Sequence, residues 1–324
     1  MSVIRQIRAF IQGAPVVFFH EFHRPPYGGG NQFLMALKKQ LEATGLIVGV
    51  NRVGHPTKAC LINSYNFDFK AVYRAKMNFQ KIRWVHRIDG PIGVYRSRDD
   101  GTDRRIWDIN QELGAVTVFQ SNYSLKKHLE LGYTFRDARV IHNAVDPSIF
   151  YSSPRKPLPD QKDKIKLVAT SWSDNVNKGA ETYRWLEQNL DWSRYEFTFV
   201  GRCKIPFKRI RHLPPCSSEK VAALLREHDI YMMASQHESC SNALLEALAC
   251  GLPAVYVNSG SNPELVGSAG VAYETPEQAL VGLDTVGRNM AYYQSKISVV
   301  SLDAVCRQYG SLMLNEHSDF TSFS

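Results

Sequence analysis

The chain has 324 residues, of which 44% are apolar and 22% charged. This is an ordinary globular composition with enough length for two domains, which excludes a disordered or fibrous protein. No apolar run approaches the roughly 20 residues of a membrane span, and the N-terminal stretch lacks the pattern of a signal peptide. The net charge of +8 suits an anionic substrate, a nucleic acid or an anionic membrane surface and does not decide among them.

Short apolar segments of the first half read as strands, and helix-like segments such as 31–45 and 124–132 separate them. Strands of nearly continuous apolar residues that are joined by helices predict a parallel sheet covered on both faces. The strand-like segments are VVFFHEF (16–22), LIVGVN (46–51), ACLINSY (59–65), IRWVHRI (82–88), AVTVFQS (115–121) and ARVIHNA (138–144).

A second series of the same kind follows a proline-rich, charged stretch at 151–164 that is linker-like in composition. Its strands are IKLVATS (165–171), YEFTFVG (195–201), DIYMMAS (229–235), PAVYVN (253–258) and GVAY (270–273), and its helices are expected near 179–190, 218–228, 242–250 and 276–285. We therefore predict an α/β protein of two doubly wound, Rossmann-like domains that face each other across a cleft. The predicted boundaries are 1–153 and 154–304, with a C-terminal helix at about 305–324 that packs back on the first domain.

Two polar clusters of the first domain fall where such sheets bind ligands, at the carboxyl ends of strands. In the loop HRPPYGGGNQF (23–33), Gly29 and Gly30 allow the backbone to approach phosphate or sugar oxygens closely. This is not the G-x-G-x-x-G pattern of nicotinamide-binding proteins, and a tight turn without a ligand is the alternative. The second cluster places His86, Arg87 and Asp89 at a strand end, where a structural histidine is the alternative to a binding one.

A third cluster follows the first strand of the second domain. Lys178 stands at the start of a helix, where a positive charge opposes the helix dipole unless an anion is bound there. A solvated surface lysine is the alternative. Arg202 follows the next strand and is succeeded by the basic run KIPFKRIR (204–211), although such a run is more often a solvated face than a site.

The most informative segment is HESCSNALLEALACGLP (237–253). From Asn242 on it reads as a helix, which Gly251 and Pro253 end, and a helix start is a ready site for an anion. Two carboxylates, Glu238 and Glu246, lie on either side of this start, eight residues apart. Because carboxylates repel an anion, we expect them to bind hydroxyl groups of the same ligand.

Together these segments resemble the family-4 retaining glycosyltransferases of the GT-B fold, also described as group 1 glycosyltransferases. The resemblance rests on ESCSNALLEALACGLP with NPELV, and on GGGNQF, VIHNAVDPSIF and NKG, which follow one another in the family's order between about Val16 and Tyr273. It implies a retaining, metal-independent transferase of the hexosyltransferase type. Such an enzyme moves a sugar from a nucleotide-sugar donor to an acceptor hydroxyl of a glycan, a glycolipid or a small molecule.

The resemblance also implies that the domain at 1–153 lies on the acceptor side and that the domain at 154–304 binds the nucleotide-sugar donor. It further implies which residues bind the nucleotide. Glu246 would accept hydrogen bonds from the ribose hydroxyls. The N–H groups around Ser241, Asn242 and Ala243 would bind the diphosphate, and Lys178 would stand beside the leaving phosphate. Donors that are already aimed at the leaving group stabilise the charge that it gains in the transition state.

Other matching residues are expected to contact the sugar or to close over the donor. Glu238 would hold hydroxyls of the transferred sugar, and His86 would contact the sugar near its anomeric carbon. Gly29 and Gly30 would cover the diphosphate from the first domain. These contacts would orient the sugar for transfer.

One position departs from the family. Ser173 stands five residues before Lys178, where the family usually has an arginine that also binds phosphate, and Arg202 or a residue of the basic run is the candidate replacement. Two alternatives to a transferase are a sugar-nucleotide epimerase on the same fold and a non-catalytic protein that binds sugar nucleotides or glycans.

We expect no cofactor beyond the nucleotide-sugar co-substrate, and no metal, because no Asp-x-Asp pair stands at a strand end. Nucleic-acid binding has only the net charge in its favour. Six cysteines without a C-x-x-C pair indicate reduced thiols and a cytoplasmic location. The cations of residues 70–87, interleaved with Phe79 and Trp84, suggest peripheral contact with the inner face of an anionic membrane, with a solvated helix face followed by a buried strand as the alternative.

Overall fold

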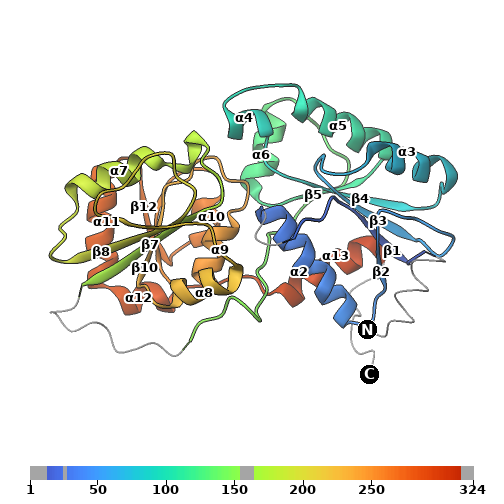
Figure 1. The fold of residues 1–324 in the computed structure, drawn as a ribbon. Helices are drawn as coiled ribbons and strands as arrows, with labels where there is room; N and C mark the ends of the chain where they lie inside the picture. Colours follow the sequence, from blue (N-terminus) through green and yellow to red (C-terminus); the bar gives the residue numbers. More distant parts are fainter. Residues whose placement is uncertain (1–12, 25–27, 154–163, 315–324) are drawn as a thin grey trace. The chain divides into compact units, whose positions relative to one another are not determined.

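The structure is a computed structural model that describes residues 13–24, 28–153 and 164–314. It divides into two compact units, each built on one six-stranded sheet (Figure 1). Unit 1 comprises Met1–His23, Phe33–Asn143 and Val300–Ser324, and unit 2 comprises Arg24–Gln32 and Ala144–Val299. The predicted class, α/β with two doubly wound parallel sheets, is confirmed.

The sheet of unit 1 contains the six strands predicted from the apolar segments. Every neighbouring pair runs parallel, as expected for strands that are connected by helices. In spatial order the strands are β2 (Val48–Val50), β1 (Val16–Phe19), β3 (Ala59–Asn63), β4 (Arg83–Ile88), β5 (Val116–Phe119) and β6 (Ala138–Val140).

Helices cover both faces of this sheet (Figure 1). The helices of unit 1 are α3 (Phe69–Asn78), α4 (Ile92–Arg96), α5 (Thr102–Leu113), α6 (Asn122–Glu130) and α13 (Leu302–Leu314), together with α2 (Gly29–Ala43) from Phe33 onward, whereas the start of α2 up to Gln32 belongs to unit 2. α3 and α5 bury apolar side chains against one face, whereas α13 contacts β3 and β4 and packs beside α2 through Phe33 and Tyr309. Part of the predicted helix at 305–324 lies outside the described residues, because α13 is described only to Leu314.

The sheet of unit 2 contains the five predicted strands and one more. Its spatial order is β12 (Gly270–Tyr273), β11 (Ala254–Val257), β10 (Ile230–Met233), β7 (Ile165–Ser171), β8 (Tyr195–Gly201) and β9 (Arg211–Leu213). β9 was not predicted, because its three residues contain no apolar run. The chain adds strands outward from β7 in one direction and then from β10 in the other. The pair β7–β10 is therefore the switch point of this doubly wound sheet, where such folds bind ligands.

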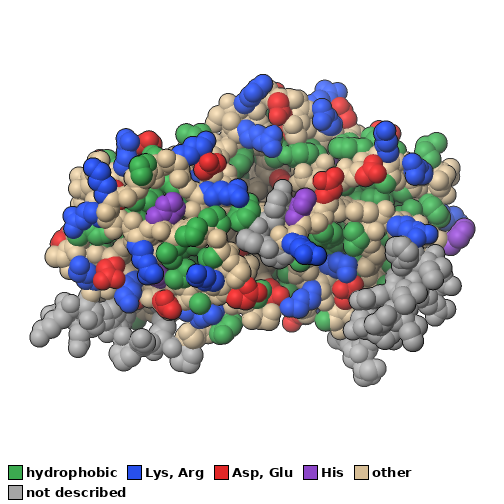
Figure 2. Space-filling view, in the orientation of Figure 1, with side chains coloured by type: hydrophobic (Ala, Val, Ile, Leu, Met, Phe, Trp, Pro, Cys, Tyr) green, Lys and Arg blue, Asp and Glu red, His purple; other side chains and the backbone are tan. Residues whose placement is uncertain are grey.

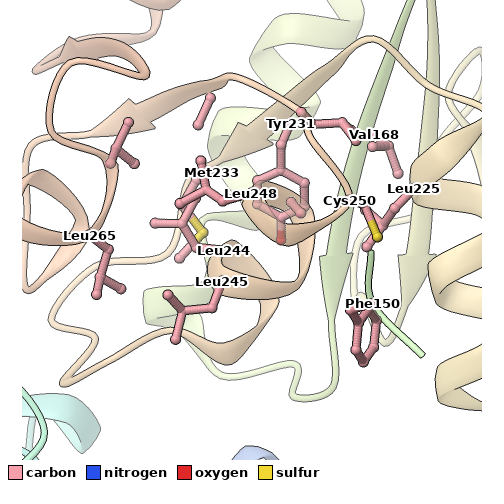
Figure 3. Packing of buried hydrophobic residues seen from close by; sticks show 14 of the residues in the cluster. Phe150, Val168, Leu225, Tyr231, Met233, Leu244, Leu245, Leu248, Cys250 and Leu265 are labelled. Atoms are coloured by element: carbon pink, nitrogen blue, oxygen red, sulfur yellow. The ribbon is translucent and has the colours of Figure 1, made fainter. Parts of the chain in front are cut away.

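Two layers of helices cover the sheet of unit 2. On one face lie α8 (Ser218–Arg226), α9 (Asn242–Ala249) and α10 (Asn262–Val266), and on the other α7 (Ala180–Asn189), α11 (Pro276–Arg288) and α12 (Met290–Ser295). Figure 3 shows Leu244 and Leu248 of α9 packed near Tyr231 and Met233 of β10. Burial of this face fixes the helix on the sheet by the hydrophobic effect. Glu246 remains at a partly exposed position on α9.

Candidate active site

The switch point of unit 2 brings together the segments that follow β7 and β10. β7 leads into a 3₁₀ turn, Val176–Lys178, and β10 leads into the loop that precedes α9. The N–H of Gln236 donates to the carbonyl of Asn177 at 2.8 Å, which ties the two segments together. Gly179 has φ +75°, and a Cβ there would lie 2.4 Å from the carbonyl oxygen of Ala234. The close approach of the two segments therefore requires glycine at this position.

This geometry joins two of the predicted site residues. The ammonium of Lys178 and the carboxylate of Glu238 form an ion pair, and their side chains are only 19% and 13% exposed. Shielding of this degree strengthens the attraction compared with a surface pair. The sequence predicted both residues at the site but not their contact.

A second loop, the one that follows β11, holds the backbone around Glu238. The N–H of Ser261 donates to the carbonyl of Glu238 at 2.8 Å, and the N–H of His237 donates to Ser259 Oγ at 3.1 Å. At Gly260, where φ is +64°, a Cβ would lie 2.6 Å from both the nitrogen and the oxygen of Glu238. These supporting residues were not predicted from the sequence. Their only signal was the glycine- and asparagine-bearing loop beside NPELV.

The start of α9 offers backbone donors. Ser241 caps the helix by accepting a hydrogen bond from the N–H of Leu244 at 3.3 Å. The N–H of Ala243 has no hydrogen-bond partner within the described part of the chain. Unpaired N–H groups at the positive end of a helix dipole are suited to an anion. Ser241, Asn242 and Ala243 thus lie together at this helix start, one turn before Glu246.

Glu246 has an unusual electrostatic environment. Glu246 retains some surface exposure, but protein atoms are packed around its carboxyl group. The resulting loss of hydration raises the pKa of this carboxyl group to about 8. Its carboxylate has no hydrogen-bond or ion-pair partner among the described residues. A carboxyl group that lacks a partner and has a strongly raised pKa marks a candidate binding site.

The hydroxyl of Tyr231 belongs to the same environment. It lies 3.0 Å from Thr170 Oγ1, and burial together with the negative charge of Glu246 raises the pKa of Tyr231 to about 12. Tyr231 therefore stays protonated as a neutral neighbour of Glu246. Tyr231 and Thr170 were predicted only as strand residues.

The structure also describes the position that departs from the family. Ser173 lies in a turn, where its hydroxyl accepts from the N–H of Asn175 at 3.2 Å and its carbonyl accepts from Ser171 Oγ at 2.6 Å. Arg202, at the end of the neighbouring strand, stacks over the ring of Trp172 at 4.6 Å and forms no ion pair with a described residue. Arg202 is thus an exposed cation near the turn that contains Ser173.

His86 lies in unit 1 within β4, where its ring is fully buried. Nε2 hydrogen-bonds to the carbonyl of Ser64 at 2.8 Å, and Nδ1 lies 3.3 Å from the side-chain amide of Asn110. Burial lowers the pKa of His86 to about 4, so that the ring is neutral at physiological pH. Its contact with a sugar stays a prediction, one that requires this ring to become accessible.

The glycines of the first domain lie at the start of a helix. Gly29 and Gly30 form the first turn of α2, and the N–H of Gln32 donates to the carbonyl of Gly28 at 3.2 Å. Residues 25–27 of the same loop lie outside the described residues. The coverage of a diphosphate by Gly29 and Gly30 stays a prediction.

The basic and aromatic segment at 70–87 is only partly a surface. Trp84 and Arg87 are buried in the central strand β4, which corrects the expectation that they form part of a membrane-contacting face and agrees with the alternative of a helix face followed by a buried strand. Lys70, Arg74 and Lys81 are exposed. Figure 2 shows Lys and Arg side chains scattered over the face in view rather than gathered in one patch.

None of the described helices is both long enough and apolar enough to cross a bilayer. The described His, Cys, Asp and Glu side chains nowhere form a group of three or more that could hold a metal ion.

Comparisons with known proteins concern the family profile and the fold. Residues 185–282 match the family profile described as glycosyl transferases group 1. No curated protein is significantly similar to the chain. Sucrose-phosphate synthase from Thermosynechococcus elongatus has a similar structure, with a TM-score of 0.72 and 14% identity over 93% of this chain and 98% of that one.

Two other solved structures are similar over most of their length. WaaG, a glycosyltransferase involved in lipopolysaccharide biosynthesis, has a TM-score of 0.64 and 13% identity over 93% of this chain and 100% of its own. HepE from Anabaena, solved in complex with UDP and glucose, has a TM-score of 0.62 and 16% identity over 92% of this chain and 95% of its own. At these identities the likeness shows the fold, which is GT-B.

Proposed function

We propose that this chain, which has the GT-B fold and whose residues 185–282 match the group 1 glycosyltransferases, transfers a sugar from a nucleotide-sugar donor to an acceptor hydroxyl. The observation that carries the proposal is the meeting of Lys178 and Glu238 at the switch point of unit 2, beside the start of α9. A cation, the backbone N–H groups at this helix start and two acceptor carboxylates suit the three parts of a nucleotide sugar: its diphosphate, its ribose and its sugar.

In this proposal the diphosphate binds at the start of α9, and Lys178 provides a positive charge next to it. Negative charge builds up on the diphosphate as its bond to the anomeric carbon breaks, and groups already aimed at it lower the barrier. Arg202 is the candidate for the second cation that the family has at the position of Ser173. Glu246 accepts hydrogen bonds from the ribose, and Glu238 accepts hydrogen bonds from the sugar once the donor displaces it from Lys178.

We infer transfer with retention of configuration. The acceptor oxygen forms its bond to the anomeric carbon on the face that the diphosphate leaves, while the bond between that carbon and the phosphate oxygen breaks. The proton of the acceptor hydroxyl passes to the departing phosphate oxygen, so that no protein base is needed. The anomeric configuration of the product, determined by NMR, tests this part of the proposal.

We also propose that transfer requires no metal, because Lys178 and the start of α9 take the place of a cation. Activity should then persist in EDTA. Activity that is lost in EDTA and restored by Mg²⁺ or Mn²⁺ would contradict this phosphate site.

The first experiment is a donor panel. HepE was solved with UDP-glucose, so the panel starts with that donor and continues with other nucleotide sugars. Release of free nucleoside diphosphate together with a glycosylated product supports a transferase. An epimerised nucleotide sugar supports the epimerase instead, and binding without turnover supports a non-catalytic protein.

Two substitutions, one at the site and one away from it as the control, test whether release depends on the site. Lys178→Ala removes the charge beside the proposed diphosphate and should abolish nucleoside diphosphate release. Lys220→Ala changes an exposed lysine of α8 in the same unit and should leave the release unchanged. Equal release by the parent and Lys178→Ala would contradict the site.

A further inference from the structure

A buried arginine lies at the carboxyl edge of the sheet in unit 1. Arg87 is fully buried, and its guanidinium donates to Asn63 Oδ1 at 2.5 Å and to Asn143 Oδ1 at 2.8 Å. The guanidinium also lies 4.8 Å from the ring centre of Phe33. Burying such a charge is costly, and well-packed apolar residues often stabilise a core equally well. An arginine held in this way therefore suggests a use beyond stability.

Asp89 supplies the negative charge that faces this arginine. Its Oδ1 accepts from Arg87 Nη1 at 3.2 Å and from the side-chain amide of Gln120. Its Oδ2 has no partner among the described residues, and the side chain is 29% exposed. One carboxylate oxygen is thus fixed by protein, and the other is presented to solvent.

Side chains that follow several strands of the sheet hold Asp89 in position. The side-chain amide of Asn143, which follows β6, donates to Gln120 Oε1 at 3.0 Å, and Gln120 follows β5. The hydroxyl of Ser124, in the first turn of α6, donates to the carbonyl of Asp89 at 3.2 Å. Together with Asn63 at the end of β3, these contacts hold the carboxylate in place before any ligand arrives.

The chemistry of this group selects its ligand. A carboxylate only accepts hydrogen bonds, so its open oxygen needs a donor. The charge of Arg87 largely cancels that of Asp89, so that a cation would gain little there and a neutral hydroxyl group fits better. The carboxyl edge of a parallel sheet is also where ligands of such folds bind.

We propose that Asp89 Oδ2 binds a hydroxyl group of a sugar acceptor in unit 1 and that Arg87 is the residue that positions it. This inference rests on the proposed function, to which it adds a carbohydrate as the class of acceptor. It assigns the site to residues Asn63, Arg87, Asp89, Gln120 and Asn143.

The substitution Asp89→Asn separates binding from folding. The amide oxygen can still accept from Arg87 and Gln120, while an NH₂ group that only donates replaces the outward oxygen. The matched control is Asp137→Asn. Asp137 pairs with Arg139 at 2.6 Å in the same unit, at an exposed position, and its φ of +49° is one that asparagine tolerates.

The experiment measures sugar binding directly, by saturation-transfer NMR on the full chain loaded with UDP. The probes are the methyl glycosides of glucose, galactose, mannose and N-acetylglucosamine. We expect the parent and Asp137→Asn to bind at least one of them, and Asp89→Asn to bind it at least tenfold more weakly. The affinity of Asp89→Asn for UDP, measured by calorimetry, should equal that of the parent.

Each other outcome is decisive. If the parent binds none of the four glycosides, or if Asp89→Asn binds as the parent does, the inference is overturned. Should Asp89→Asn fail to fold, Asp89→Glu, which keeps the charge but moves the open oxygen by one methylene, replaces it under the same criteria. Sugar binding that depends on Asp89, without nucleoside diphosphate release from any donor, would refute the proposed transferase and leave this binding site standing.

Discussion

Lys178 and Glu238 form an ion pair although each is expected to bind a different part of the donor. The carboxylate of Glu238 therefore pairs with the same ammonium group that a phosphate is expected to bind. A nucleoside diphosphate must break this ion pair to bind Lys178, and it has no sugar hydroxyl groups that could bind the released carboxylate of Glu238. A nucleotide sugar offers hydroxyl groups to the released carboxylate, so that the pair should favour the donor over the product.

The first prediction tests this competition. Glu238→Gln should bind UDP more tightly than the parent, on the order of fivefold or about 1 kcal/mol, because no carboxylate competes for Lys178. The same variant should lose sugar transfer. Calorimetry with UDP measures the first effect and product formation the second.

The control for this prediction is Glu181→Gln. Glu181 pairs with Arg184 at 2.9 Å in the first turn of α7, at an exposed position in the same unit. Its loss should leave UDP affinity unchanged. If Glu238→Gln binds UDP no more tightly than Glu181→Gln does, the ion pair does not compete with the phosphate.

The second prediction concerns Gly260, which packs against the backbone of Glu238. In Gly260→Ala the new Cβ would lie 2.6 Å from Glu238 N and O, so that one of the two loops must move. We expect sugar transfer to fall at least tenfold, because misplacing the sugar-binding carboxylate by a fraction of an ångström weakens its contacts. UDP affinity should change less than transfer does.

The matched control is Gly114→Ala in unit 1. Gly114 has φ +59°, close to the +64° of Gly260, but a Cβ there would meet nothing within 4 Å. This variant carries the same left-handed strain, about 1–2 kcal/mol, without the clash. Similar losses of transfer in both variants would show that strain rather than the contact with Glu238 is responsible.

Much of the fold could be predicted from the sequence, because apolar strands that alternate with helices show locally. Eleven of the twelve strands correspond to predicted segments, and only β9 was missed. The start of α9 was also predictable, since Asn242, Gly251 and Pro253 mark the two ends of a helix.

The contacts of the site could not be predicted in the same way. The pairing of Lys178 with Glu238 depends on β7 and β10 being neighbours, which is a property of strand order rather than of either segment. His86 illustrates a second limit. A polar residue near a strand end looks the same in sequence whether it faces solvent or, as here, lies between Ser64 and Asn110.

The third prediction concerns the pH dependence of nucleotide binding. The pKa of Glu246 is raised to about 8, and only its ionised form accepts from two ribose hydroxyls. UDP binding should therefore favour the deprotonated form of Glu246, and UDP affinity should rise as the pH increases from about 7 to 9. Calorimetry with UDP across this range measures the effect.

Glu246→Gln provides the comparison, because it keeps the shape of the side chain and cannot ionise. The variant should bind UDP roughly tenfold more weakly than the parent at pH 9, since a hydrogen bond to a charged acceptor contributes about 1.5–3 kcal/mol. Any remaining pH dependence in the variant belongs to other groups, including the phosphates. Equal pH profiles for parent and variant would exclude Glu246 from nucleotide binding.

The last prediction concerns the stability that His86 contributes. Its pKa is lowered from 6.5 to about 4 by burial, so that between these values the unfolded chain binds a proton that the folded chain does not. The free energy of unfolding should consequently fall as the pH drops from 6.5 toward 4, and His86 should account for about 2 kcal/mol of that loss at pH 5. His86→Gln can still donate to Ser64 and accept from Asn110 without titrating, so its stability should fall less between pH 7 and pH 5 in urea unfolding. If parent and variant lose equal stability while the variant loses turnover at neutral pH, His86 acts on the substrate rather than in the core.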